Sequence, residues 1–482
     1  MKNKKKVLFV TLIALVALLA GAFGVVLISQ NTPTTQQSGP KEKTFDEKGI
    51  RTFADWTSCE VLQSVPAMIV EGTKIGTAIN YGANNWTIDV NGSVLSDYQA
   101  YLSLLEKAGF TKYADNGEKG LDEDVYTATY TRSELVVTVT HMVKWNKTYI
   151  AACKDLTLSE HLIYDESYVK ENIDGAKTVL HMMELYDFGN SFIIQLKNGH
   201  LIVNDGGSTE DAPYLFDYLE SLVPDGEKPV IEAWIISHAH EDHMGAFRTI
   251  MTKPEYADRV FVEGVYYNIP SEETANKFGA GNQTSVRYVE MSYKFYKTTK
   301  GTSPELYRMN TGQRYYFCDV EIEVPLTQDQ ILYENHYRDF NDTSTWLMYH
   351  IEGQKMLLSG DADVGASKVV MSLYDSSYFE MDVFTAFHHG INVWDPFTDF
   401  CTFKTVLYPC YRTGSIHLND EYVMEEENKH LQEAAAECLA YGRGTQVLTF
   451  PYKIGTAKQL EPLDWSYHSN EREFYFGRVE NY

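Results

Sequence analysis

The chain reads Val230-Ile-Glu-Ala-Trp-Ile-Ile-Ser-His-Ala-His-Glu-Asp-His-Met-Gly-Ala-Phe-Arg-Thr-Ile-Met251 at the point that decides its fold. Residues 230–237 are mostly apolar and β-branched, which predicts a buried strand, and a helix is expected to begin at Met244. Between them, four metal-ligand side chains lie within six positions: His238, His240, Asp242 and His243. Buried imidazoles and carboxylates need polar partners, and a metal ion supplies one. This strand-to-helix loop therefore predicts a site for two divalent ions that share one water, with a histidine-rich solvated loop as the alternative.

Three further segments carry polar residues at the ends of expected strands. Residues 192–203 predict a hairpin with an Asn198-Gly199 turn, and Asn204-Asp-Gly-Gly207 follows it. Lys355-Met-Leu-Leu-Ser-Gly-Asp361 ends a strand in Gly-Asp, and Val383-Phe-Thr-Ala-Phe-His-His-Gly390 ends one in two histidines. Taken alone, each is an ordinary turn or a capped strand end.

With these segments in this order, the chain resembles the metallo-β-lactamase fold superfamily over roughly residues 175–455, about three fifths of its length. The resemblance implies an α/β fold, the metallo-β-lactamase αββα sandwich, with two divalent ions, zinc first and manganese as the alternative. It implies catalytic roles for Asp242 and Asp361 and a supporting role behind the ligands for Asp205. The implied metal ligands are His238 and His240 for the first ion, Asp242, His243 and His389 for the second, and Asp361 for both, with His388 as the rival of His389.

One histidine of the family pattern has no clear counterpart. Many members place a further ligand between the first motif and the Gly-Asp strand, where this chain offers only His336 and His350. His336 lies in a polar loop near the expected site, whereas His350 lies in a strand where alternation can point it at solvent or at the core. Either His336 or a water is expected to complete the first metal site.

The segment Asn341-Asp-Thr-Ser344, followed by these strands, is similar to the extracellular hydrolase domain of DNA-uptake competence proteins. That subfamily also places Asn and His before a late helix, as Asn428-Lys-His430 precedes residues 431–440 here. By this resemblance His430 lines the substrate pocket; the alternative is a surface helix N-terminus.

The N-terminal region predicts location and domain organisation. Residues 1–6 are basic, and residues 7–28 carry no charge over 22 positions, enough for about 33 Å of helix. We expect a signal anchor over residues 1–28 with the body outside the cell membrane, or a secreted protein if the segment is cleaved. A linker over residues 29–45, a small α+β domain of open role over residues 46–165 and the hydrolase domain over residues 170–482 complete the expected organisation.

The small domain is expected to contain short strands, one helix and a meander. Strands are predicted over residues 76–81 and 86–90, with a helix capped by Ser96 and ended by Gly109. Residues 125–131, 134–143 and 147–153 alternate as a three-stranded meander. Cys59 and Cys153 are a possible bridge, and all six cysteines fit equally well as small core residues.

The net charge of the chain limits the classes of molecule that it is expected to bind. The formal net charge is −26, and the basic residues are scattered apart from the N-terminus, which disfavours binding of long nucleic acids without removing it. The expected function is hydrolysis of a phosphodiester or related ester by a metal-bound water. The alternatives are an extracellular nuclease, a lactonase or β-lactamase, and a metal-dependent binding module without turnover.

Overall fold

The computed structural model describes residues 56, 59–76, 78–80, 85–170, 172–186, 189–270, 291–297, 304–333, 340–390, 393–409, 426–441 and 444–463. All of them belong to one compact unit, Thr44–Tyr482. The predicted anchor and linker lie outside these residues. Among the residues described, no helix combines the length and the apolar character that crossing a bilayer requires.

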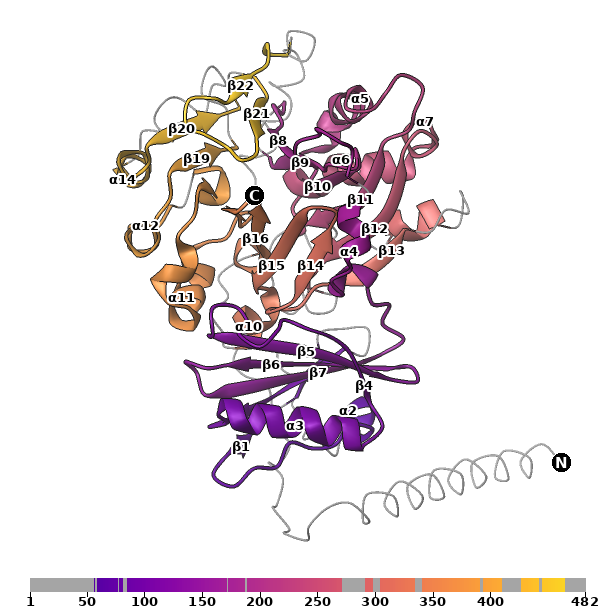
Figure 1. Ribbon diagram of the computed structural model, residues 1–482, viewed down its shortest axis with the longest axis vertical. Coiled ribbons are helices and arrows are strands. Elements are labelled where there is room, and N and C mark those ends of the chain that lie inside the picture. Colours follow the sequence, from indigo (N-terminus) through magenta and orange to yellow (C-terminus); the bar gives the residue numbers. More distant parts are fainter. Residues whose placement is uncertain are drawn as a thin grey trace, which may run out of the picture. The chain divides into compact units, whose positions relative to one another are not determined.

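The strands form three sheets, and Figure 1 labels most of their strands. The first large sheet runs β13 (Glu305–Arg308), β12 (Phe261–Tyr267), β11 (Val230–Ile236), β10 (Leu201–Asp205), β9 (Ser191–Gln195), β8 (Val179–Met182), β21 (Gln446–Thr449), β22 (Lys458–Gln459). The second runs β14 (Arg314–Phe317), β15 (Val320–Leu326), β16 (Trp346–Ile351), β17 (Gln354–Leu358), β18 (Val383–Thr385), β19 (Thr405–Tyr408), β20 (Glu437–Ala440). The small N-terminal sheet runs β1 (Lys74–Ile75), β3 (Trp86–Asn91), β7 (Lys147–Lys154), β6 (Leu135–Met142), β5 (Val125–Arg132), β4 (Thr111–Asp115), with β2 (Ile79–Asn80) paired to β3.

Alternation along β16 shows how the second sheet is buried on both faces. Leu347 and Tyr349 belong to the core shared with the first sheet, whereas Trp346 and Met348 belong to a second core. Successive side chains on a strand point to opposite faces, so the two cores lie on opposite sides of this sheet. The two large sheets therefore face each other in a mixed α/β architecture.

Helices cover the outer faces of these sheets, as Figure 1 shows for α5 to α7 beside the first sheet and α11, α12 and α14 beside the second. The helices are α2 (Glu60–Gln63), α3 (Leu95–Lys107), α4 (Glu166–Lys170), α5 (Ala212–Ser221), α6 (Glu241–Thr252), α7 (Pro254–Ala257), α10 (Gln328–Tyr333), α11 (Val364–Leu373), α12 (Asp395–Phe400) and α14 (Glu426–Ala434). The 3-10 turns are η1 (Glu160–Leu162), η2 (Thr209–Asp211), η3 (Asn341–Thr343), η4 (Ser376–Phe379) and η5 (Phe387–Gly390). The helix expected over residues 431–440 is only partly right, because α14 ends at Ala434 and the following segment adds β20 to the edge of the second sheet.

The small sheet contains the predicted meander, β5 to β7, with α3 packed on it. The prediction that Ser96 caps this helix is wrong: the N-cap is Val94, whose backbone N–H donates to the Asp97 carboxylate at 2.9 Å. Cys59 and Cys153 are both buried and form no disulfide, so they serve as small core residues and not as a bridge.

The turn between β13 and β14 packs against the small N-terminal sheet. Thr127 in β5 donates to the Thr311 carbonyl at 3.0 Å, and Asn116 donates to the Gly312 carbonyl at 2.9 Å. A β-carbon on Gly312, whose φ is +90°, would lie 2.0 Å from the Thr127 hydroxyl oxygen. Only glycine fits this close approach, so the contact depends on this one residue.

Candidate metal centre

The histidine-rich stretch lies where β11 ends and α6 begins. His238 follows the strand, and His240 is the N-cap of α6 with an extended backbone. Asp242 and His243 lie in the first turn of the helix, so the predicted helix start at Met244 is wrong. The unpaired N–H groups and the dipole at a helix N-terminus stabilise acidic side chains, which is why the helix can begin among the candidate ligands.

Asp361 and His389 come from the second sheet. β17 and β18 are parallel, so their carboxyl ends meet at one edge of the sheet, and Asp361 and His389 follow them. His388 and His389 have left-handed backbones, with φ of +46° and +56°. Such conformations are uncommon outside glycine and collect at functional sites, and here they place the two imidazoles in different environments.

The structure brings the six predicted ligands into two groups that share Asp361. One group is Asp242, His243, Asp361 and His389, and the other is His238, His240 and Asp361; within each, one ligand atom per residue lies within 4.8 Å of all the others. The Asp361 Oδ2 atom lies 3.1 Å from His243 Nε2, 3.3 Å from His389 Nε2 and 3.7 Å from His238 Nε2.

These donors fit divalent transition metals. Imidazole nitrogens with carboxylate oxygens are the ligands that zinc and manganese accept. Asp361 Oδ1 and His243 Nε2 are buried and make no hydrogen bond to any residue that the structure describes. Buried polar atoms without hydrogen bonds are costly, and coordination of a cation would satisfy both.

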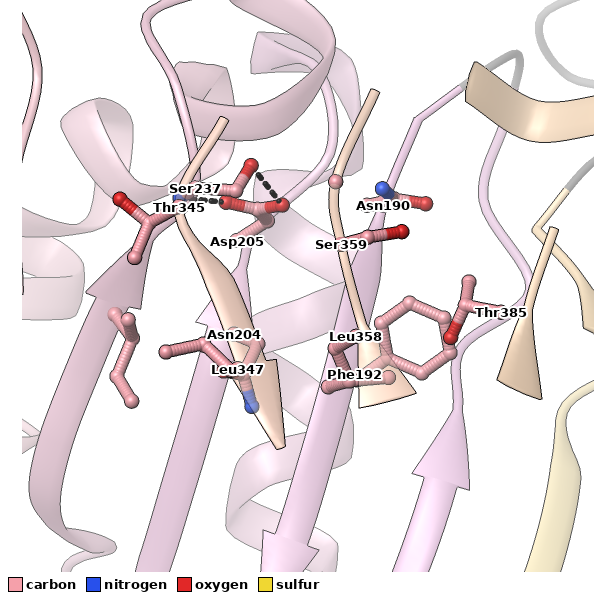
Figure 2. Close-up of a pocket in the computed structure, with 12 residues that line it drawn as sticks. Asn190, Phe192, Asn204, Asp205, Ser237, Thr345, Leu347, Leu358, Ser359 and Thr385 are labelled. Atoms are coloured by element: carbon pink, nitrogen blue, oxygen red, sulfur yellow. Dashed lines mark hydrogen bonds between the residues drawn. The ribbon is translucent and has the colours of Figure 1, made fainter. Parts of the chain in front are cut away.

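Asp205 supports the cluster from the end of β10. Its Oδ2 atom accepts from the Ser237 hydroxyl at 2.7 Å and lies 2.8 Å from His243 Nδ1, and its Oδ1 atom accepts from the Ser237 N–H at 2.8 Å. Figure 2 shows the two dashed contacts between Asp205 and Ser237. A carboxylate on Nδ1 fixes the ring so that Nε2 faces Asp361, which is how outer residues orient a metal-binding histidine.

The buried charges are strongly coupled. Burial lowers the pKa of His243, but Asp361, Asp242 and Asp205 outweigh it and hold that pKa well above its usual value. Burial raises the pKa of Asp361, but His243 and His389 outweigh burial and hold that pKa well below its usual value. The pKa of His389 rises to about 9, since Asp361 and Asp242 outweigh its burial. Protons on imidazoles therefore balance the carboxylates when no cation does.

The structure distinguishes the two candidate ligands that follow β18, His388 and His389. His389 belongs to a metal-candidate group, whereas His388 lies 3.8 Å from Asp361 and its ring nitrogens are 3.3 Å from Asn341 Nδ2. His388 is 20% exposed, so it borders the open side of the site.

The remaining predicted histidines lie elsewhere. His430 is on the exposed face of α14 and pairs with Asp399 at 2.8 Å. This position agrees with the alternative in which His430 belongs to a surface helix. His350 lies 3.1 Å from Glu323, whose carboxylate also pairs with the Arg314 guanidinium at 2.8 Å. His336 lies outside the described residues.

Sequence reasoning passed over Ser237 and Phe340. Ser237 holds Asp205 and also lies 3.1 Å from His238 Nδ1, and the Phe340 ring lies 6.0 Å from the His240 ring. A serine directly before the first histidine was a usable signal for Ser237, whereas nothing in the local sequence marked Phe340.

Comparison with known proteins agrees with this geometry for one part of the chain. Residues 186–300 match the metallo-beta-lactamase superfamily model, a range that includes Asp205 and the histidine-rich stretch. A metallo-beta-lactamase with a HARLDQ motif from Cronobacter sakazakii (Enterobacter sakazakii) is 15% identical, with 36% of this chain and 58% of that chain covered and a TM-score of 0.21. The chain thus spans less than two thirds of that structure. No curated protein sequence matches.

Proposed function

We propose that the protein is an extracellular, membrane-anchored metal-dependent hydrolase that cleaves a phosphodiester or a related ester. The observation that carries this proposal is the pair of buried His and Asp groups that share Asp361, within a chain that contains a metallo-beta-lactamase superfamily domain. A carboxylate common to two ligand groups suits two ions better than one.

Each residue has a role in this proposal. His238 and His240 would hold the first ion and Asp242, His243 and His389 the second, with Asp361 available to both. When bound, two divalent ions make hydroxide available near neutral pH and neutralise charge that develops on the substrate oxygen. The protein holds the imidazole rings in place, with Asp205 and Ser237 fixing His243, and it buries His238, His243, Asp361 and His389 almost completely. The nucleophile is water, and no side chain is required to attack.

Two groups at the open side are placed to contact substrate. Asp242 is 30% exposed and His388 is 20% exposed, and Asn341 Nδ2 lies against the His388 ring. The His388 imidazole, held by the Asn341 amide, would offer an N–H donor beside a cationic centre, an arrangement that suits phosphate oxygens. A phosphodiester is therefore the preferred substrate over a lactone or a cephalosporin.

Three chromogenic substrates test this choice. The purified, metal-loaded protein is expected to cleave a phosphodiester faster than a lactone or a cephalosporin. Asp361→Ala is expected to abolish turnover and release both ions, whereas His336→Ala keeps much of the activity if a water completes the first site. Equal and complete losses in the two variants would make His336 a true ligand.

Salt dependence separates a small-ester hydrolase from a nuclease. The net charge of −26 predicts that few phosphates outside the metal pocket meet Lys or Arg. Plasmid DNA should therefore be cleaved slowly and bound with a shallow salt dependence. Tight, steeply salt-dependent binding with rapid degradation would favour an extracellular nuclease, and a metal-loaded protein without turnover would favour a binding module.

Location is tested separately. The uncharged stretch over residues 7–28 is proposed to anchor the protein with its body outside the cell. Intact cells treated with an external protease should lose the body of the protein, and cell fractionation should place the full chain with membranes. Recovery of the protein inside protease-treated cells would contradict this location.

A further inference from the structure

Three consecutive residues after β18 have left-handed backbones. The φ angles are +46° at His388, +56° at His389 and +88° at Gly390. Glycine adopts this conformation at little cost, whereas a histidine in it crowds its own β-carbon against the following carbonyl oxygen. Two histidines in a row therefore keep this conformation only where their surroundings hold them. The contacts that hold residues 388–390 decide where the His389 imidazole points.

Two backbone carbonyls hold the histidines of this run. The His388 N–H donates to the Gly360 carbonyl at 3.4 Å. The His389 Nδ1 atom lies 3.1 Å from the Pro409 carbonyl oxygen, which can only accept, so Nδ1 carries a hydrogen and Nε2 is the atom left to bind a metal. Neither contact depends on the side chain of the residue that accepts.

A side chain holds the third residue of the run. The amide of Asn428, in the first turn of α14, donates to the Gly390 carbonyl. Asn428 is only 1% exposed, although His430, two residues later, lies on the exposed face of the same helix. A β-carbon on Gly390 would lie 3.2 Å from the Asn428 amide oxygen and 3.0 Å from the Tyr408 ring, so the groups fit closely. Asparagine is a weak helix former and a buried amide needs a partner, so this position indicates a specific contact.

We propose that Asn428 is a positioning residue that orients the metal ligand His389 through the Gly390 carbonyl. With this hydrogen bond lost, the run is free to relax toward the right-handed or extended conformations that histidine prefers. The His389 ring would then leave Asp242 and Asp361, whose Oδ2 atoms lie 3.2 Å and 3.3 Å from its Nε2 atom. This role rests on the proposed function, because it requires that His389 bind a metal ion.

The two candidate metal groups should respond differently to the loss of this contact. His389 belongs to the group that contains Asp242 and is absent from the group that contains His238 and His240. Loss of the positioning contact should therefore weaken one metal site and leave the other nearly unchanged. A residue that only stabilised the fold would weaken both sites or neither.

Zinc titration against a competing chelator tests this difference. In Asn428→Ala, one zinc dissociation constant is expected to rise about tenfold, as after loss of other groups that orient a metal ligand, while the second changes less than about threefold. The affected site should be the one that His389→Ala, which removes the ligand itself, weakens more strongly. Asn428→Asp keeps the shape of the side chain but offers no N–H, so it is a second variant with the same expected result. Equal changes at both sites, or no change at either, would overturn the positioning role.

Asn116→Ala is the matched control for general destabilisation. Asn116 is 4% exposed, and its side-chain amide donates to the Val125 and Gly312 carbonyls at 2.9 Å, yet it belongs to neither metal group. Urea unfolding of the metal-free proteins should show that the Asn116 and Asn428 variants fold and that both lose stability. Zinc affinity at one site should fall in the Asn428 variants alone; a loss of the same kind in the control would count against the proposal.

Hydrogen exchange in the metal-free protein tests the contact without zinc. The backbone amides of residues 386–390 are expected to exchange about tenfold faster in Asn428→Ala than in the unsubstituted protein, and at an unchanged rate in Asn116→Ala. Unchanged exchange in Asn428→Ala would overturn the proposal. An unsubstituted protein that binds no zinc would refute the proposed function and with it the metal-binding part of this role, whereas the exchange rates would still decide whether Asn428 holds the run.

Discussion

Replacement of Asp205 by asparagine tests how the metal ligands are held. The carboxylate takes part in three contacts at 2.7–2.8 Å, two with Ser237 and one with His243 Nδ1. Hydrogen bonds to a charged group contribute about 1.5–3 kcal/mol each. Asparagine keeps one acceptor oxygen but turns an N–H donor toward groups that also donate, so we expect about 3–5 kcal/mol of lost unfolding free energy. Because His243 loses its orienting partner, the zinc dissociation constant should rise about 10–100-fold, or roughly 1.4–2.8 kcal/mol.

Urea unfolding of the metal-free protein measures the first effect, and competition with a chelator measures the second. Asp211→Asn is the matched control. This buried carboxylate accepts from the backbone N–H groups of Tyr186 at 2.6 Å and Ser208 at 2.8 Å and belongs to neither metal-candidate group. The control should lose stability while keeping its zinc affinity. If Asp205→Asn binds zinc as tightly as the control does, the orienting role of Asp205 is refuted.

Three further predictions concern stability and protonation. Gly312→Ala should lower the free energy of unfolding by roughly 2–5 kcal/mol, because the alanine is strained at φ +90° and its β-carbon would lie 2.0 Å from a side-chain oxygen of β5. Gly353→Ala, at φ +76° with open space around it, should cost only the strain; equal losses in urea unfolding would count against the docking contact. Burial lowers the pKa of His141 and of His181 to about 4, so the unfolded chain takes up these protons first as the pH falls below about 6.5. Stability should therefore fall between pH 6.5 and pH 4, by about 2 kcal/mol per histidine at pH 5, and a drop unchanged in His181→Gln would argue against that residue's part. Because the pKa of His389 is about 9 in the metal-free chain, zinc binding at pH 7 should release at least about one proton per chain into weakly buffered solution, and zinc uptake without proton release would contradict that protonation.

The histidine-rich stretch was predictable because its ligands are adjacent in sequence. A strand followed by a helix fixes a local turn, so His238 and His243 lie close together whatever the rest of the chain does. Asp361 was found by its order along the chain, and the structure places it between the two groups because β17 and β11 belong to facing sheets.

The sequence pattern did not predict features that depend on the backbone conformation of single residues. His389 and His388 are neighbours of one type, and only their left-handed conformations decide which imidazole faces Asp361. The start of α6 was misplaced because Glu241 and Asp242 look like loop residues, yet a helix N-terminus stabilises them. Ser96 was a reasonable cap by residue type, but the N-cap is Val94, two residues earlier, whose N–H donates to the Asp97 carboxylate.

The metal content of the purified protein tests the proposed two-ion centre most directly. Six strong ligands in two groups that share one carboxylate predict close to two transition-metal ions per chain, about the number that elemental analysis should return after incubation with zinc or manganese. Asp361→Ala, measured beside it, should lose both. A protein that remains metal-free after incubation with either ion would contradict the assignment of this site.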